Sequence, residues 1–413
     1  MKISPPGPVT TRPPAHSEVC VRRVEQDIEV RFHYPVVFLR GLFDPHQSAL
    51  ACEIERADPN RRHRVLMFVD DGFASAWPRV AEDMAQYAQA WSQVMELMAP
   101  PMFVPGGEQI KHDMDTIRDL LHRLSRSGLC RHSFVLVAGG GAVLDAVGFC
   151  ASLVHRGLRI IRVPTTVLAQ NDAGVGVKTG LDTDGGKNTI GTFAPPYAVF
   201  NDLNFLRTLD DANWIGGTAE AFKVAILNDA AFFEYLEHHA EAIPRRDEQV
   251  METLVVRCAE LHLDHIRTGG DPFEFGTARP LDFGHWAAHQ LEAISGYKIG
   301  HGPAVAVGIA VDSLYARHEG WLSDRDCERV LRALYRAGFP LWYEELDRRL
   351  PNGQREILEG LRTFREHLGG DLCLTYPHGI GRRREERTIR TQQIEDCIQE
   401  LRERFGPRAP HDG

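Results

Sequence analysis

The sequence predicts an α/β fold, with a Rossmann-like, doubly wound parallel sheet in the N-terminal half and a mostly helical C-terminal half. Three observations support this prediction. Short apolar runs alternate with amphipathic helical patterns over residues 26–205. One of these runs ends in Gly139, Gly140 and Gly141, which open the next helix. Long amphipathic patterns with little strand signal then fill residues 206–395.

The two ends of the chain are expected to be tails. Residues 1–25 contain five prolines among small and polar residues, and residues 396–413 end in a short segment with proline and glycine. Folded structure is expected to begin within residues 26–43, where Ile28, Val30, Phe32 and Tyr34 alternate with polar residues in the two-residue period of a strand.

The remaining elements follow in chain order. In the N-terminal half we expect a strand over residues 64–71, a helix through Trp91, Val94, Met95 and Met98, an extended segment over 100–105, a helix over 113–124, and strands over 133–138, 160–164 and 197–202. In the C-terminal half we expect helices over residues 218–228, 247–264, 283–295, 304–317, 324–337 and 354–367.

The composition excludes several classes of protein. Among 413 residues, 57 acidic side chains face 47 basic ones, and the formal net charge of -10 argues against a nucleic-acid binder. No apolar run is long enough for a membrane span, and the first residues lack the apolar core of a signal peptide, so a cytoplasmic protein is expected. The 8 cysteines are scattered singly, which predicts reduced thiols rather than disulfides or a thiolate zinc site.

The glycine turn is a candidate dinucleotide site. Glycines let a backbone approach a diphosphate closely, and a helix N-terminus supplies free N–H groups. The spacing GGGxxxD, which ends at Asp145, also fits a plain tight turn. Further polar segments follow three other expected strands, at residues 70–72, 106–111 and 164–166, and carboxylates at such strand ends can bind ribose hydroxyls.

Two further segments carry candidate chemistry. Residues 170–188 hold Lys178, Lys187 and several glycines between two apolar strands, which indicates an anion-binding loop or simply a solvated one. His285 and His289 are four residues apart and would share one helical face, as in a zinc-binding pair. With His301 and Glu220 they offer a Glu/His set without thiols, which suits a catalytic zinc.

Seven motifs in this order resemble the 3-dehydroquinate synthase family, the sugar phosphate cyclases. They are GGGxxxD, RVPTT, QNDxxVGxKTG, GGKN, AExxK, GHxxxHxxE and GHGxAVxxG, and the similarity covers most of residues 30–375. The resemblance implies an NAD-binding α/β domain and a helical metal-binding domain. Within the family, the chain looks closest to the EboD-like and 2-epi-5-epi-valiolone synthase-like branch.

The resemblance also implies roles for individual residues. NAD would be contacted by Asp71, Glu108, Lys111, Gly139, Gly140, Gly141, Asp145, Thr165 and Thr166, and a divalent metal, Zn²⁺ or alternatively Co²⁺, by Glu220, His285 and His301. The substrate site would be lined by Asp172, Lys178, Lys187, Asn188 and Lys223, with His289 and Arg156 at the phosphate. On this resemblance His289 is not a metal ligand, and Arg156 comes from a neighbouring subunit, so a homodimer is expected.

The implied reaction turns a phosphorylated ketose into a carbocycle. NAD oxidises one hydroxyl, phosphate is eliminated, the same NADH reduces the carbonyl, and the opened sugar closes by an aldol step. Zinc would polarise the reacting oxygens and lysines would stabilise developing charge.

The substrate is expected to be sedoheptulose 7-phosphate-like and to lack a carboxylate. Dehydroquinate synthases carry asparagine where Asp282 stands, arginine at Ala278 and lysine near Cys258, and His367 replaces another basic residue. A carboxylate at Asp282 together with fewer cations would repel a substrate carboxylate. Three alternatives stay open: an authentic 3-dehydroquinate synthase, an NAD- and metal-dependent alcohol dehydrogenase of the glycerol type, and a noncatalytic binding protein that kept the fold.

Overall fold

The computed structural model describes residues 24–183, 186–271, 273, 280–367 and 372–407. Residues 34–413 form one compact unit, and the described part of the other unit, residues 24–33, has no regular secondary structure. The strand expected from Ile28, Val30 and Phe32 is therefore wrong, and these side chains are 76, 64 and 54% exposed. The first strand is β1, Val36–Leu39, because only there does the backbone pair with β9. A period of two makes a strand only where a partner strand satisfies its backbone groups.

The described residues form a parallel sheet of seven strands. Its order is β1-β9-β6-β5-β2-β3, and β4 also pairs with β2. After β1, the strands are β2 His63–Asp70, β3 Met95–Leu97, β4 Met102–Val104, β5 Phe134–Gly139, β6 Arg159–Pro164 and β9 Ala198–Asp202. All of β5 is buried, as expected for a strand covered on both faces.

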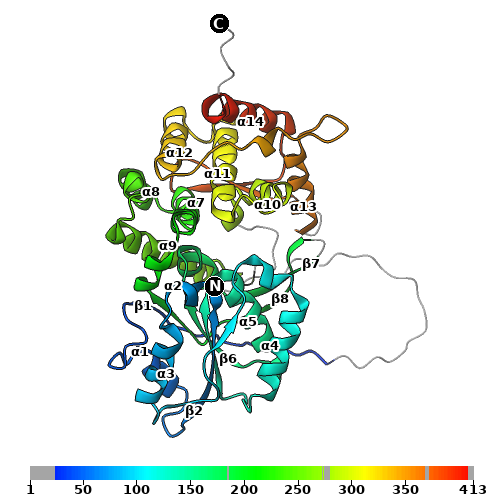
Figure 1. Cartoon of the computed structure of the whole chain (residues 1–413). Helices are drawn as coiled ribbons and strands as arrows, with labels where there is room; N and C mark the ends of the chain where they lie inside the picture. The colour runs from blue at the N-terminus through cyan, green and yellow to red at the C-terminus, as the bar shows by residue number, and fades with distance from the viewer. Residues whose placement is uncertain (1–23, 184–185, 272, 274–279, 368–371, 408–413) are drawn as a thin grey trace, which may run out of the picture. The chain divides into compact units, whose positions relative to one another are not determined.

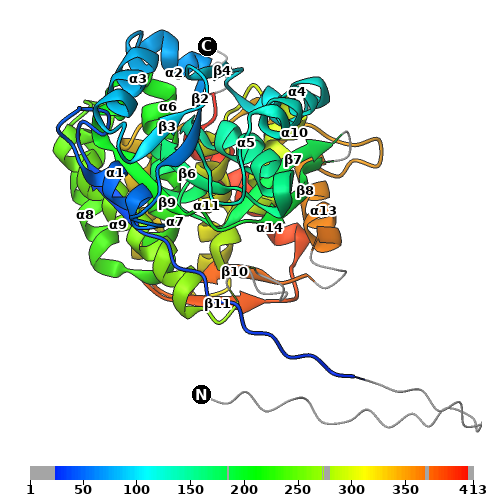
Figure 2. The same ribbon diagram turned by 90° about the horizontal axis from the view of Figure 1, so that it is seen from below.

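Helices cover both faces of this sheet (Figures 1 and 2). α1 (Ala49–Glu55) and α3 (Val80–Ala90) pack on one face, and α4 (Met114–Arg126) and α5 (Gly141–Leu153) pack on the other. The short helices of this half are α2 Asp71–Ala76 and the 3-10 turns η1 Glu108–Lys111, η2 Val154–Arg156 and η4 Leu203–Thr208. The doubly wound arrangement predicted from the sequence is confirmed.

Two segments of the sheet half differ from the expectation. The helical pattern through Trp91 and Met95 is wrong, because α3 ends at Ala90 and Met95 begins β3, where it is fully buried and pairs with His63. Pairing with β2 overrides the local pattern. The expected loop at residues 170–188 consists of a π-helical turn, η3 (Ala169–Ala173), followed by an antiparallel hairpin of β7 (Lys178–Thr183) and β8 (Gly186–Phe193).

The C-terminal half is mostly helical, as predicted. Its longer elements are α6 Asp211–Gly216, α7 Thr218–Asn228, α8 Ala230–His239, α9 Glu248–Thr268, α10 His285–Ile294, α11 His301–His318, α12 Asp324–Arg336, α13 Glu359–His367 and α14 Thr391–Phe405. The short ones are η5 Ala240–Ala242, η6 Pro280–Asp282, η7 Glu344–Asp347, η8 Glu356–Leu358 and the hairpin of β10 Leu374–Pro377 with β11 Arg383–Glu386.

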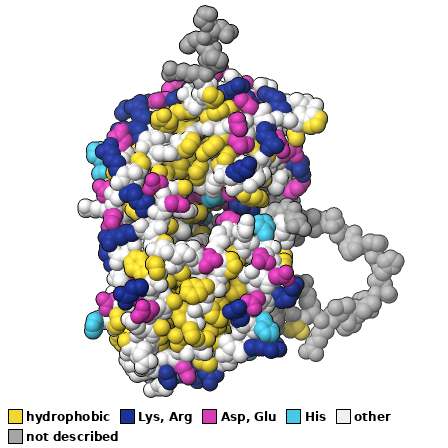
Figure 3. Space-filling model, viewed as in Figure 1, with side chains coloured by type: hydrophobic (Ala, Val, Ile, Leu, Met, Phe, Trp, Pro, Cys, Tyr) yellow, Lys and Arg dark blue, Asp and Glu magenta, His cyan; other side chains and the backbone are white. Residues whose placement is uncertain are grey.

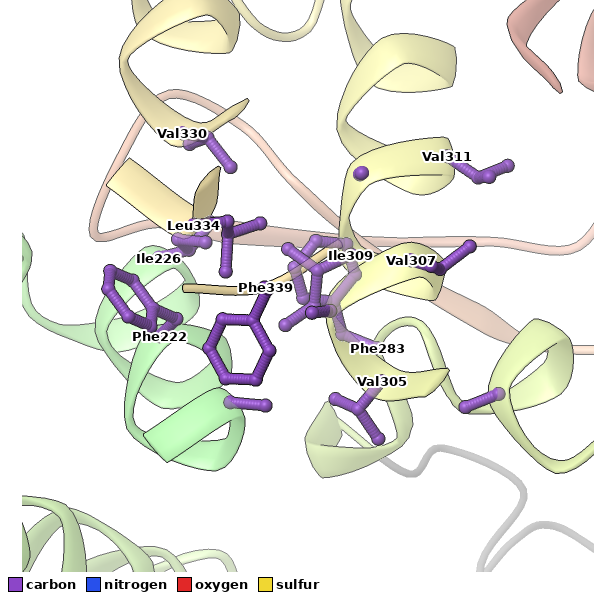
Figure 4. Close-up of a cluster of buried hydrophobic side chains, with 14 of the residues drawn as sticks. Phe222, Ile226, Phe283, Val305, Val307, Ile309, Val311, Val330, Leu334 and Phe339 are labelled. Carbon is purple, nitrogen blue, oxygen red and sulfur yellow. The ribbon is translucent and has the colours of Figure 1, made fainter. Parts of the chain in front are cut away.

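α11 is the central helix of this half. Every residue from Ala304 to Ala316 is buried, which fits a helix that neighbours surround on all sides. Figure 4 shows Val305, Val307 and Ile309 of α11 among apolar side chains from α7 and α12. The last helix is a correction, because residues 396–405, expected in the C-terminal tail, continue α14 and bury Cys397, Ile398 and Leu401.

Candidate active site and metal centre

The C-terminal ends of four neighbouring strands meet at one edge of the sheet, as the sequence suggested. Gly139 at the end of β5 lies opposite Pro164 at the end of β6. The Asp70 carboxylate, at the end of β2, accepts a hydrogen bond from the Gly140 amide at 3.4 Å. Asp71, which begins α2, accepts one from the amide of Gly106 at 2.8 Å. Polar groups from four strands are therefore within reach of one ligand.

The glycine turn has the features that a dinucleotide requires. Gly140 is the N-cap of the 13-residue helix α5 and offers no side-chain cap, so the first N–H groups of this helix lack a capping partner. A Cβ on Gly106 would lie 2.4 Å from the Asp70 carboxylate, so any side chain there would have to displace the carboxylate that caps α2. Thr165 is buried and its backbone N–H donates to the Gly139 carbonyl at 3.0 Å, while Thr166 Oγ1 accepts a hydrogen bond from Ala169 N at 3.1 Å. The residues present thus fit a diphosphate.

A buried network links the expected NAD residues to the hairpin. Lys111, in the same short helix as Glu108, is 4% exposed, and its ammonium lies 3.1 Å from the Asp145 carboxylate and 3.8 Å from that of Asp182. It also donates a hydrogen bond to the side chain of Asn188. Burial raises the pKa of Asp145, although Lys111 acts in the opposite direction. Asp182, whose side chain is fully buried, was not singled out from the sequence.

The hairpin carries the lysines expected at the substrate. Lys178 is the first residue of β7, and Lys187 lies on β8. The Lys187 ammonium donates to Glu292 of α10 at 2.6 Å and lies 5.4 Å from the centre of the Tyr297 ring. Burial alone would lower the pKa of Lys187, but Glu292 and Glu108 together raise it. The expected anion-binding loop is therefore a hairpin whose lysine is fastened to the helical half.

The candidate metal centre consists of Glu220, His285 and His301. Glu220 comes from the first turn of α7, His285 begins α10, and His301 begins α11. One ligand atom from each lies within 4.8 Å of the others. Nε2 of His285 is 3.5 Å and Nε2 of His301 is 3.4 Å from the same oxygen, Oε1 of Glu220. Three helix N-termini thus direct three possible ligands to one point.

The donor set fits a divalent metal. Glu220 is 1% exposed, and its Oε1 accepts no hydrogen bond within the described structure. The Nδ1 atoms of both rings are occupied, in His285 by the Phe283 carbonyl at 3.1 Å and in His301 by a Glu292 oxygen at 3.1 Å. In the neutral imidazole rings these contacts favour a proton on each Nδ1 and leave the lone pair on each Nε2. A buried carboxylate oxygen and two such nitrogens are typical ligands of a catalytic zinc.

His289 takes a different position from that of a simple zinc pair. Its ring centre lies 5.4 Å from that of His285 and 6.0 Å from that of His301. It belongs to a second possible ligand group with Glu292 and His301, in which it is the exposed member. The structure therefore keeps His289 beside the first group without including it there.

A second buried lysine faces this centre. Lys223 is 2% exposed and forms an ion pair with the other oxygen of Glu220. Burial would lower the pKa of Lys223, but Glu220 and Asp172 raise it, with a smaller contribution from Asp282. Asp282 thus acts electrostatically on the same lysine as the metal-site carboxylate.

Sequence reasoning missed the partner of Asp172. Nδ1 of His262, on α9, lies 2.6 Å from Oδ1 of Asp172. Burial would raise the pKa of Asp172, but His262 and Lys223 lower it below its usual value. His262 lies one turn after Cys258, so the same face of α9 carries both residues. Only the long-range packing of α9 on η3 reveals this contact.

Asp312 was also missed, although it shapes the turn before His285. It lies in α11, is 1% exposed, and accepts hydrogen bonds from Gly284 N at 3.0 Å and Trp286 Nε1 at 2.9 Å. The two donors flank His285 in sequence, so this carboxylate fixes the start of α10. Burial raises the pKa of Asp312 to about 7, against the effect of its two hydrogen bonds.

Some expected site residues are not brought together. Arg156 is exposed beyond the far end of α5, which at 13 residues is about 20 Å long. His155 and Arg156 both have a positive φ, 54° and 64°. His367 is the last residue of α13, and its side chain lies outside the described part of the chain, as does Ala278.

On the face seen in Figure 3 the surface is hollowed between the sheet half and the helical half.

Comparisons with known proteins agree with these features. The family models for the N-terminal and C-terminal parts of 3-dehydroquinate synthase match residues 101–216 and 217–354. The chain is 33% identical over 305 residues to a 3-dehydroquinate synthase of Pelobacter propionicus, covering 74% of this chain and 82% of that one. It is 34% identical over 353 residues to a 2-epi-5-epi-valiolone synthase of Streptomyces glaucescens, covering 84 and 85%.

A solved structure resembles the whole fold. It is ValA, a 2-epi-5-epi-valiolone synthase from Streptomyces hygroscopicus subsp. jinggangensis 5008 with NAD⁺ and Zn²⁺ bound. The TM-score is 0.80 at 28% sequence identity, and the match covers 92% of this chain and 99% of that one. Matched family models, sequence relatives and fold agree, and this chain belongs to the 3-dehydroquinate synthase family.

Proposed function

We propose that this protein is a sugar phosphate cyclase, a phosphate-eliminating carbon–oxygen lyase that holds NAD and a divalent metal, Zn²⁺ or Co²⁺. Its substrate is a heptulose 7-phosphate, and sedoheptulose 7-phosphate fits better than a carboxylated heptulosonate. The observation that carries the proposal is the group of Glu220, His285 and His301, with Glu220 and His285 buried, beside Lys223. The bound ValA structure supports both cofactors.

The chain's own residues divide the work between its two halves. NAD, when bound, would take one hydride from the substrate and return it. The α5 N-terminus and Asp71 would hold it, while Lys111 keeps the hairpin against this site. Glu220, His285 and His301 would hold a divalent ion, and the bound ion would polarise the reacting oxygen. Lys187 and Lys223 would stabilise the negative charge of phosphate and of the developing enolate.

The choice of substrate rests on the balance of charge. Asp282 adds a carboxylate that acts on Lys223, and Cys258 places a buried thiol where the resemblance expects a lysine. An extra carboxylate and a missing cation disfavour a substrate carboxylate, at a cost of about a few kcal/mol if it is desolvated. The relative from Streptomyces glaucescens, a 2-epi-5-epi-valiolone synthase, supports the same choice.

The test is phosphate release from two substrates. Purified protein with NAD and Zn²⁺ is incubated with sedoheptulose 7-phosphate or 3-deoxy-D-arabino-heptulosonate 7-phosphate. We expect release from the first, and release from the heptulosonate alone would refute the substrate assignment in favour of an authentic 3-dehydroquinate synthase. Asp282→Asn should reduce the ratio of the two rates, sedoheptulose 7-phosphate over heptulosonate, by about tenfold or more. Asp264→Asn, which removes an exposed carboxylate of α9, should leave this ratio unchanged.

We also infer a homodimer in which Arg156 reaches the partner's site. Its exposed position and the two successive positive φ angles at His155 and Arg156 support this inference, because strained backbone tends to mark functional segments. Leu153, three residues before Arg156, is an exposed apolar side chain that the partner would cover. Sedimentation analysis tests it: a monomer at working concentrations would contradict this arrangement.

A further inference from the structure

One buried carboxylate joins the candidate metal centre to the candidate substrate lysine. Glu292 of α10 is 3% exposed and has a partner on each oxygen. Oε2 accepts from Nδ1 of His301 at 3.1 Å, and Oε1 accepts from the Lys187 ammonium at 2.6 Å. Glu292 is the last residue of the motif GHxxxHxxE, but the resemblance assigned it no role.

The two partners come from opposite halves of the chain. Lys187 lies on β8 of the hairpin, and His301 begins α11 in the helical half. Along α10, His285, His289 and Glu292 lie at spacings of four and three residues and so share one face. The same face of α10 therefore carries the metal ligand His285 and the carboxylate of Glu292 that contacts His301.

The contact with His301 decides which nitrogen of that ring is available. A carboxylate beside Nδ1 favours the proton on Nδ1, so in the neutral ring the lone pair lies on Nε2, which is 3.4 Å from Glu220. A glutamine at position 292 could accept from only one of the two partners through its single oxygen, and its NH₂ group would face the other donor. The second partner would then lose its bond.

We propose that Glu292 is a positioning residue that uses one carboxylate to orient the metal ligand His301 and the substrate lysine Lys187, so that metal affinity and the position of Lys187 are coupled. The proposal rests on the proposed metal site, but it concerns binding of the metal alone. It therefore stands or falls separately from the identity of the sugar.

The test measures Co²⁺ affinity of the apoprotein by competition with a chelator, together with the visible absorption spectrum of the Co²⁺ form. Glu292→Gln should weaken Co²⁺ binding about 10- to 100-fold and change the spectrum, as loss of a carboxylate behind a ligating histidine does. Glu260→Gln, which removes an exposed carboxylate of α9, is the matched control and should leave both unchanged. Weakening of less than threefold in Glu292→Gln would overturn the proposal.

Coupling to Lys187 is tested by a double-mutant cycle on the same affinity. Lys187→Met should change Co²⁺ affinity by a larger factor in the wild-type background than in Glu292→Gln, because only the wild type carries the shared carboxylate. Equal factors in both backgrounds would mean that the lysine acts directly on the metal, and would refute the coupling.

A folding failure of Glu292→Gln would not end the test. Glu292→Asp keeps the charge but shortens the side chain by one methylene, so it cannot hold both partners at 3.1 and 2.6 Å. We expect an intermediate loss of Co²⁺ affinity, and wild-type affinity in this variant would contradict the proposal.

Discussion

Gly302 lies at a very close backbone approach beside the metal centre. It follows His301 at the start of α11, and a Cβ there would lie 2.0 Å from the carbonyl oxygen of Gly216 in α6. Ordinary contacts of a Cβ begin near 3.4 Å, so Gly302→Ala must open the two backbones by about 1.4 Å. Both clashing atoms belong to the backbone or to Cβ, so no change of rotamer can relieve them.

The expected cost follows from this displacement. Overpacking of a tight core costs typically about 1–3 kcal/mol, and a contact of backbone on backbone belongs at the upper end. Alanine regains about 1 kcal/mol relative to glycine in a helix. Gly302→Ala should therefore lower the free energy of unfolding by about 2 kcal/mol or more. Because His301 is the preceding residue, its ring should also move away from Glu220 and weaken metal binding at least tenfold.

The assay is denaturant unfolding of the apoprotein combined with a Co²⁺ titration. Gly216→Ala is the matched control, because it lies at the same contact but its Cβ would meet only Cδ of Pro303 at 3.7 Å. The control should remain within about 1 kcal/mol of the wild type, as a substitution without a clash does. If Gly302→Ala matches the control in both stability and Co²⁺ affinity, the close packing of α6 on α11 does not position the metal ligand.

Two further predictions concern buried charges. The pKa of Asp312 is raised to about 7, so between pH 4 and 7 the folded state binds a proton that the unfolded state releases. The contribution of Asp312 to stability is therefore fully present below pH 4 and is lost as the pH rises through 7. The free energy of unfolding of the wild type, relative to Asp312→Asn, should therefore fall by an amount on the order of 4 kcal/mol from pH 4 to pH 8. Denaturant unfolding measures this difference, and a difference that stays constant with pH would contradict the reasoning. Lys111→Met removes the cation beside the buried Asp182 and the half-buried Asp145. It should cost about 3–5 kcal/mol of stability and weaken NAD binding, whereas Lys298→Met, at an exposed position, should do neither. Calorimetric NAD titration and unfolding check both variants, and wild-type behaviour of Lys111→Met would exclude the network from the site.

The fold was predictable where local patterns and tertiary packing agree. The continuous apolar run of β5 and the glycines after it predicted a buried strand and a helix start, and the amphipathic pattern at 218–228 predicted α7 with the observed bounds. The failures occurred where a distant partner decides. Met95 lies in a strand because it pairs with β2. The alternating apolar residues before residue 34 have no partner strand in the described structure and form none.

The candidate site was predictable in part for the same reason. Glycines at a strand end and histidines at helix starts carry local signals, which the motifs preserve. Asp312 and His262 look like ordinary polar positions of helices in the sequence, and Glu292 ends the motif GHxxxHxxE without a role assigned to it. Each becomes significant only through a residue far along the chain: Lys187 for Glu292, Gly284 for Asp312 and Asp172 for His262. No local pattern encodes such contacts.

The most direct test of the proposed function follows phosphate and NADH together during turnover of sedoheptulose 7-phosphate. A cyclase reuses its NAD, so we expect phosphate to be released over many turnovers per enzyme. The NADH concentration, measured by absorbance, should never exceed the enzyme concentration. His301→Ala, which removes a proposed metal ligand, should abolish that release. NADH that accumulates in proportion to substrate consumed, without phosphate, would instead show an alcohol dehydrogenase and contradict the assignment.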